Sequence, residues 1–381
     1  MNLRTLSIFI HLDIHFYKNQ LKILTDNISK RFLNNITFHF YMPNKLNLFY
    51  PKNSELIIQK DLSYFLKIRD HRMYSGFLDY INKKKIDLSI IYRLEYPEFL
   101  LSDLNFFKKI NSKIFIISWA YELNNKSEAR SNLFVDLIKN QNITKCIIPS
   151  ILGKDSTGPK YFEKKFNLIK KKIIKISEIR FYKPINYNKN FCRKKINLQT
   201  KKFVLLFFGQ PFFGKGFDIF IKLIKSYKKK NILFYIQTPL KNINFDIKKL
   251  NQINKYKNLV FKNKSVNSNL VKYIYGAADA VCIPYKKTYT YGTSSVFFES
   301  ILFSRPVIVP NFNPFRNILK KFKLGVLFES EDLKSLKKNL DKLVDGFDYN
   351  SFKEDRELYI NYTDDYKLFI DTIEDEFKSL E

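Results

Sequence analysis

The chain has 381 residues and a formal net charge of +31, which arises from 67 basic and 36 acidic residues. Hydrophobic residues make up 45% and aromatic residues 17%, which excludes a disordered chain, because such chains lack the apolar area that offsets the entropy cost of ordering. The three cysteines, Cys146, Cys192 and Cys282, are widely separated, which excludes a disulfide scaffold and a clustered-cysteine zinc site and favours a reducing compartment.

In the first half of the sequence, apolar runs of strand length alternate with segments of helical periodicity. We expect strands at residues 5–10, 36–41, 88–92, 114–118 and 146–149. We expect helices near residues 19–32, 71–84, 99–109, 128–140 and 160–169. Residues 177–200, which contain Pro184 and several Asn and Lys residues, are the expected linker to the second half.

The second half has a more regular alternation. We expect strands at residues 203–208, 232–236, 259–261, 280–283, 306–309 and 326–328. We expect helices at residues 215–229, 245–253, 268–275, 294–303, 314–322 and 333–344, and helical spacing at 355–380. The strands are apolar throughout, which is typical of a parallel sheet covered on both faces. The sequence therefore predicts an α/β protein with two Rossmann-like domains that face a central cleft, the default place for a ligand.

A glycine-containing loop between a strand and a helix is the first candidate site. Gly209 follows the strand at 203–208, and Gly214, Lys215 and Gly216 precede the next helix. Glycine lets a ligand approach the backbone, and a helix amino terminus and a lysine both attract anions. The loop therefore suits a phosphate or diphosphate, although the spacing of a P-loop is absent. A plain turn with a solvent-exposed lysine is the alternative.

The second candidate is the segment from Tyr291 to Ser300, where a glycine and three hydroxyl side chains precede an apolar helix. Serine and threonine are favoured at helix N-caps, so the segment is at least a well-capped helix start. Glu299 lies one turn inside this helix, and a carboxylate in apolar surroundings requires a partner. A ribose diol and an internal lysine or arginine are the two candidate partners.

Together these segments resemble the GT-B glycosyltransferases, specifically the family 4-like enzymes of group 1. The resemblance covers residues 193–344 and rests on Lys215-Gly216, on the stretch 299–308 and on the strand ending in Pro at 278–285. It implies that Lys215 binds the donor diphosphate, that Glu299 holds the donor ribose, and that Tyr291 stands where the family has another glutamate. It implies that the donor also meets Gly209, Gln210, Gly214, Gly216, Lys264, Ser265, Val266, Gly292, Thr293, Ser294 and Ser295.

The resemblance also implies an organisation and an activity. Residues 1–185 would form the acceptor-side domain, 186–352 the nucleotide-sugar-binding domain, and 353–381 a helix that returns to the first domain. The activity would be that of a hexosyltransferase-type enzyme of cell-surface polysaccharide biosynthesis. It would move a sugar from a nucleotide sugar to a saccharide or lipid-linked acceptor, and the sugar would keep its anomeric configuration. The nucleotide sugar would be a co-substrate, with no other cofactor and no metal, since no metal-ligand spacing is present. The acceptor-side candidates are His11, Asp13, His15, Trp119 and Glu122.

Two departures from the family pattern keep an alternative open. Gln210 replaces an arginine and Tyr291 replaces a glutamate, which would suit an inactive GT-B-like nucleotide-binding protein. The charge alone suggests a nucleic-acid binder, but only 11 of the 67 basic residues are Arg and no recognition motif is present, so we expect no nucleic-acid partner. No targeting or spanning segment is expected. We expect a cytoplasmic protein whose basic amino-terminal domain lies on the anionic inner face of the cell membrane.

Overall fold

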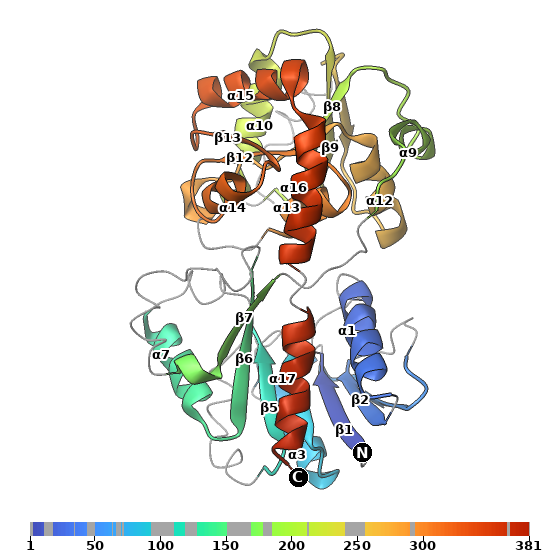
Figure 1. Ribbon diagram of the computed structural model, residues 1–381, viewed down its shortest axis with the longest axis vertical. Coiled ribbons are helices and arrows are strands. Elements are labelled where there is room, and N and C mark those ends of the chain that lie inside the picture. Colours follow the sequence, from blue (N-terminus) through green and yellow to red (C-terminus); the bar gives the residue numbers. More distant parts are fainter. Residues whose placement is uncertain are drawn as a thin grey trace. The chain divides into compact units, whose positions relative to one another are not determined.

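The computed structural model of the protein describes residues 3–10, 18–33, 35–43, 50–62, 64–65, 70, 72–92, 110–118, 128–150, 169–177, 185–211, 213–240, 256–289, 294–363 and 366–380. The chain divides into two compact units (Figure 1). The first unit comprises Met1–Phe181 and Thr363–Glu381, and the second comprises Tyr182–Thr290 and Ser294–Tyr362. The first unit therefore contains both the beginning and the end of the chain.

The strands described in the first unit form one seven-stranded sheet in which neighbouring strands are parallel. In its register, Ile8 lies between Phe40 of one neighbouring strand and Ile90 of the other. The strand order is β3-β2-β1-β4-β5-β6-β7. The bounds are β1 Arg4–Phe9, β2 Ile36–Met42, β3 Ser54–Ile58, β4 Leu88–Tyr92, β5 Lys113–Ile117, β6 Ile143–Ser150 and β7 Ile173–Ser177.

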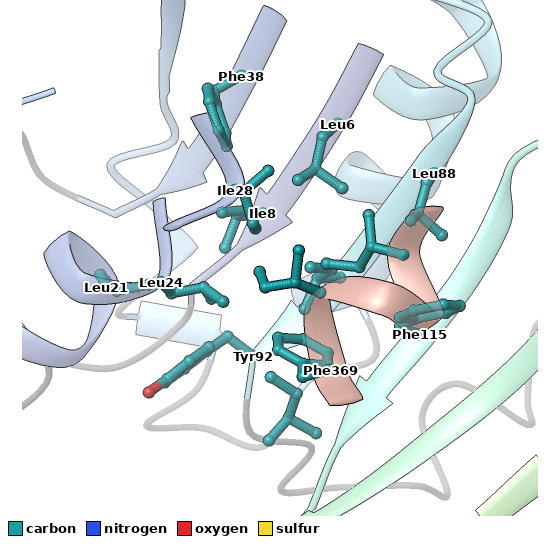
Figure 2. Close-up of a cluster of buried hydrophobic side chains, with 14 of the residues drawn as sticks. Leu6, Ile8, Leu21, Leu24, Ile28, Phe38, Leu88, Tyr92, Phe115 and Phe369 are labelled. Atoms are coloured by element: carbon teal, nitrogen blue, oxygen red, sulfur yellow. The ribbon is translucent and has the colours of Figure 1, made fainter. Parts of the chain in front are cut away.

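Helices cover both faces of this first sheet, and each face has its own hydrophobic cluster. On one face Phe77 and Phe134 come from α3 and α7. On the other face Leu24 of α1 and Phe369 of α17 pack over the same strands (Figure 2), so the last helix of the chain completes the core of the first unit. The helices are α1 Lys18–Arg31, α3 Arg72–Lys83, α7 Glu128–Lys139 and α17 Tyr366–Lys378, with a short 3-10 helix, η2, at Lys170–Lys172.

In its described residues the second unit repeats this plan, with six parallel strands in the order β10-β9-β8-β11-β12-β13. The order reverses between β8 and β11, and in sheets of this kind the ligand lies beyond the carboxyl ends of the strands at that point. The strand bounds are β8 Phe203–Phe208, β9 Ile232–Gln237, β10 Leu259–Lys262, β11 Ala280–Cys282, β12 Val307–Pro310 and β13 Gly325–Phe328.

One helix near the carboxyl terminus fixes another helix of the second unit. Arg356 of α16 is buried, and its guanidinium donates to the carbonyl oxygens of Ile301 at 2.7 Å and Leu302 at 2.8 Å, which end α13. A cation at these carbonyls also stabilises the negative end of the helix dipole. The helices of this unit are α9 Lys189–Lys195, α10 Phe217–Ser226, α12 Ser268–Ala277, α13 Ser295–Leu302, α14 Phe315–Lys321, α15 Leu333–Gly346 and α16 Tyr349–Tyr362, with 3-10 helices η3 Phe213–Lys215 and η4 Lys287–Tyr289.

The structure confirms the predicted α/β class with two parallel-sheet units, and it differs from the sequence prediction in three places. The expected linker at 177–200 contains α9. The buried Cys192 of α9 packs on Gly276 of α12, where only a glycine fits, because a Cβ atom on Gly276 would lie 2.5 Å from the Cys192 sulfur. The helical pattern at 355–380 belongs to two helices, α16 in the second unit and α17 in the first. β3 and β7 were not predicted. The helices expected near 99–109, 160–169 and 245–253 lie outside the described residues.

Candidate functional site

The glycine that follows β8 starts the candidate site at the point where the strand order of the second sheet reverses. Gly209 has a left-handed backbone with φ 99. Its amide donates to the carbonyl oxygen of Gln237 at 3.1 Å, and its carbonyl accepts from the hydroxyl of Thr238 at 2.6 Å. A residue with a Cβ atom rarely adopts this conformation. The chain therefore turns sharply at the carboxyl end of β8 and is tied there to the end of β9.

The second part of the same loop packs against the segment that follows β11. Gly216 is the N-cap of α10 and also has a left-handed backbone, with φ 64. The carbonyl of Gly214 accepts from the amide of Lys286 at 2.9 Å, and the Lys286 ammonium lies 3.0 Å from the carboxylate of Asp218 in α10. These contacts join the loops after β8 and β11 into one surface.

Lys215 lies within this surface, immediately before α10. It is half-buried, and its ammonium is 5.8 Å from the ring centroid of Tyr285. The helix was predicted to begin at Lys215, but it begins at Phe217, because the left-handed Gly216 interrupts helical geometry. Lys215 is therefore held in the turn that leads into the helix amino terminus, where the helix dipole also favours an anion.

The amino terminus of α13 lies beside Gly209. A Cβ atom built on Gly209 would be 3.6 Å from a side-chain methyl of Val296, in the first turn of α13. The N-cap is Ser294, whose buried hydroxyl accepts from the amide of Phe297 at 3.1 Å. The structure thus brings three predicted site residues, Gly209, Ser294 and Ser295, to one edge of the second sheet.

Glu299 lies on the partly open face of α13. It is half-buried, as is Ser295 four residues earlier, whereas the other residues of the helix are buried. Residues four apart share one face of a helix, so the hydroxyl and the carboxylate lie on the same side of α13. Glu299 is therefore more exposed than its apolar sequence surroundings indicated.

Tyr285 contacts both Lys215 and Ser294, and the sequence did not single it out as a site residue. It is 3% exposed, and its phenol oxygen accepts a hydrogen bond from the Ser294 hydroxyl at 3.2 Å. Burial is the main cause that raises the pKa of the Tyr285 phenol, and the negative charge of Glu299 acts in the same direction. The phenol is therefore neutral at physiological pH. A polar residue just beyond the carboxyl end of a switch-point strand is the signal that could have identified it.

The segment after β10 borders the same edge. Lys264 and Ser265 are exposed and Val266 is half-buried. The side-chain amide of Gln237, at the end of β9, donates to the carbonyl oxygen of Lys264 at 2.6 Å, which fixes the segment beside the strand ends. Gln237 is buried and was not predicted as a site residue. Gln210 is exposed next to Gly209.

The other predicted site residues lie outside the described part of the chain: Tyr291, Gly292, Thr293, His11, Asp13, His15, Trp119 and Glu122. Among the described residues, no group of three or more His, Cys, Asp or Glu side chains could hold a metal ion. None of the described helices is long and apolar enough to cross a membrane.

Residues 188–362 match the family described as Glycosyl transferases group 1. No curated protein matches the sequence. Sucrose-phosphate synthase from Thermosynechococcus elongatus is 13% identical, with 99% of each chain covered and a TM-score of 0.68. HepE from Anabaena, in complex with UDP and glucose, is 11% identical, with 99% of this chain and 100% of that chain covered and a TM-score of 0.64. WaaG, a glycosyltransferase involved in lipopolysaccharide biosynthesis, is 13% identical, with 94% of this chain and 95% of that chain covered and a TM-score of 0.58.

Identities this low show a shared fold alone. The family match is independent of them and covers most of the second unit. The motif order in the sequence, the two parallel sheets and the family match agree with one another. The second unit therefore carries the segment that matches the glycosyl transferases group 1 family, and the chain as a whole has the GT-B fold.

Proposed function

We propose that the protein moves a sugar from a nucleotide-sugar donor to a saccharide or lipid-linked acceptor in cell-surface polysaccharide biosynthesis. The observation that carries this proposal is the meeting of Lys215, the Gly209 turn and the α13 amino terminus at the switch point of the second sheet. The complex of HepE with UDP and glucose supports the donor class, and the involvement of WaaG in lipopolysaccharide biosynthesis supports the setting.

In this proposal the diphosphate of the donor lies between two positive groups. The Lys215 ammonium supplies a full charge, and the amino terminus of α13 supplies amides and the positive end of a helix dipole. Glu299, on the partly open face of α13, accepts hydrogen bonds from the donor ribose. A carboxylate can accept two such bonds, and charge-assisted bonds are the stronger kind.

The proposed reaction depends on stabilising the departing diphosphate. Negative charge grows on the leaving group as the sugar bond breaks, and a fixed ammonium and helix terminus stabilise that charge without reorganisation. We propose that these groups serve in place of a metal, that the sugar keeps its anomeric configuration, and that the nucleotide sugar is a co-substrate with no other cofactor.

A second candidate is a GT-B protein that binds a nucleotide without turnover. It is favoured by Gln210, which is exposed next to Gly209 and carries no charge where the family has an arginine, and by Tyr291 in place of a glutamate. Calorimetry with UDP, GDP and ADP, followed by transfer assays with the corresponding nucleotide sugars, separates the two candidates. Binding with turnover supports the transferase, binding without turnover supports the second candidate, and the absence of binding contradicts both.

We further propose that the first unit lies on an anionic membrane surface on the cytoplasmic side. Two leucines, Leu3 at 64% exposed and Leu33 at 80%, precede β1 and β2 at the amino-terminal edge of the sheet. Exposed lysines lie at the same edge of the sheet: Lys85 precedes β4, and Lys170 and Lys171 precede β7. Apolar side chains and exposed lysines at one edge of a sheet favour a lipid surface, and each lysine near anionic lipid adds about 1 kcal/mol.

A further inference from the structure

Tyr285 contacts two parts of the candidate donor site, the turn that carries Lys215 and the N-cap of α13. It follows β11, and although it carries a hydroxyl group it is only 3% exposed. A buried polar group normally has a structural or functional reason, because an unsatisfied hydroxyl in the protein interior is costly. Here the reason lies in what the ring and the hydroxyl each touch.

The hydroxyl holds the N-cap of α13. The Ser294 hydroxyl donates to the phenol oxygen of Tyr285 at 3.2 Å and accepts from the amide of Phe297 at 3.1 Å. Both side chains are buried, so water does not compete for these bonds. The rotamer of Ser294, and with it the first turn of α13, is therefore set in part by Tyr285.

The ring faces the ammonium of Lys215. The ammonium lies 5.8 Å from the ring centroid, which is within the range of a cation–π contact. The edge-to-face contact with Tyr289 at 4.5 Å and the contact with Phe315 at 5.9 Å fix the plane of the ring. A ring held in this way gives the flexible side chain of Lys215 a preferred position.

We infer that Tyr285 is a positioning residue of the donor site, which aligns the Lys215 ammonium with the amino terminus of α13. The inference rests on the proposed function, because it assigns both groups to the donor diphosphate. Tyr285 acts through Lys215 and Ser294 and does not itself contact the donor. Prepositioning two anion-binding groups removes part of the ordering cost that a ligand would otherwise meet on binding.

A double-mutant cycle between Tyr285 and Lys215 tests the inference, with UDP, GDP and ADP as calorimetric probes. We expect Tyr285→Leu to weaken the binding of the preferred nucleotide about threefold to tenfold. In the Lys215→Ala background the same change should weaken it less than twofold, because the group that Tyr285 positions is gone. Tyr235→Leu is the matched control, since Tyr235 of β9 is also a buried tyrosine of the second unit, and it should leave nucleotide affinity unchanged in a folded protein.

A second cycle keeps the test decisive if Tyr285→Leu does not fold. Tyr285→Phe retains the ring and removes only the acceptor of the Ser294 hydroxyl. Its effect on affinity should be smaller than that of Tyr285→Leu, and it should not add to that of Ser294→Ala. If the effects of the single changes multiply in both cycles, Tyr285 is an ordinary core residue and the inference is wrong. If the wild-type protein binds none of the three nucleotides, the proposed function fails and the inference falls with it.

Discussion

Gly216 lies so close to Pro284 that a Cβ atom on residue 216 would be 1.7 Å from the Pro284 carbonyl oxygen. Gly216 is the N-cap of α10 and Pro284 follows β11, so this approach joins the loops beyond the two central strands of the second sheet. Backbone atoms cannot move aside as a flexible side chain can. The loop that carries Lys215 therefore depends on a glycine at this position for its contact with the rest of the candidate site.

Gly216→Ala should destabilise the second unit. The added methyl group meets a carbonyl oxygen, and the left-handed backbone at φ 64 disfavours any side chain. We expect a loss of about 2 kcal/mol or more in the free energy of unfolding, measured by urea denaturation. Gly346→Ala is the control, because a Cβ atom there meets nothing within 4 Å, and the change should stay within about 1 kcal/mol. Equal stability of the two variants would contradict the close approach.

Lys215→Ala should reduce turnover at least tenfold, since losing a charge-assisted contact to the diphosphate costs about 1.5–3 kcal/mol. The melting temperature should change little, because a half-buried lysine at a turn contributes little to stability. Steady-state kinetics with the preferred nucleotide sugar give the measurement. Lys222→Ala, on the exposed face of α10, should leave the kinetics unchanged. Unchanged kinetics of Lys215→Ala would remove this residue from the site.

Glu299→Gln should weaken donor binding roughly fivefold, because the amide keeps one acceptor oxygen but loses the negative charge. Glu299 is half-buried, so the melting temperature should stay nearly constant. Calorimetry with the nucleotide measures the affinity, and Glu354→Gln on the exposed surface of α16 is the control. A variant that unfolds, and that added nucleotide does not stabilise, would instead identify Glu299 as a structural partner of an internal cation.

The sequence predicts those elements whose own residues carry the signal. β4 and β8 were predicted at their observed bounds because parallel strands buried on both faces appear as continuous apolar runs. α9 has no such pattern, because its packing depends on contact between Cys192 and Gly276, which is more than eighty residues away in the sequence. A Cβ atom built on Gly276 would lie 2.5 Å from the Cys192 sulfur. β7 is a half-buried edge strand with a lysine in its centre, so its apolar run is interrupted.

The same reasoning explains which parts of the candidate site a sequence can indicate. Lys215, Gly216 and Ser294 belong to local turn and capping patterns, which a short stretch of sequence displays by itself. Tyr285 was not predicted because its contacts with Lys215 and Ser294 exist only in the folded chain. Roles for the predicted acceptor-side residues stay predictions, since those residues lie beyond the described parts of the first unit.

His39 should make the first unit sensitive to acid. It is buried in β2 with Nδ1 2.8 Å from the Tyr80 hydroxyl and 3.2 Å from the Glu55 carboxylate. Burial lowers the pKa of His39 from its ordinary value of 6.5, Glu55 opposes this and Lys84 adds to it. Below pH 6.5 the His39 imidazole therefore binds a proton more readily in the unfolded chain than in the folded chain. The free energy of unfolding is then highest above pH 6.5 and falls as the pH drops toward the pKa of His39 in the folded protein.

Urea denaturation at neutral pH and at about pH 5.5 measures this loss. His39→Gln should reduce the difference between the two pH values. Glu55→Gln should enlarge it, because the carboxylate that favours the protonated imidazole is removed. An unchanged pH dependence in both variants would show that His39 does not control acid stability.

Leu33→Asn should release the protein from anionic vesicles without unfolding it. Leu33 is 80% exposed and has a left-handed backbone with φ 49, a conformation that asparagine adopts more readily than leucine. The change removes an apolar side chain that would enter the lipid interface, and it relieves the backbone, so stability should not fall. Leu358→Gln is the control, since Leu358 is 57% exposed on α16 of the second unit.

Flotation with phosphatidylglycerol and phosphatidylcholine vesicles gives the measurement. The wild-type protein and Leu358→Gln should float with the anionic vesicles at low salt and be released at high salt, because salt screens the lysines. Leu33→Asn should float less, and neutral vesicles should carry none of the three proteins. Equal flotation of Leu33→Asn and the wild-type protein would move the contact away from this edge of the first sheet. A wild-type protein that stays unbound at low salt would make the net charge of +31 a feature of composition and would favour a soluble acceptor over a lipid-linked one.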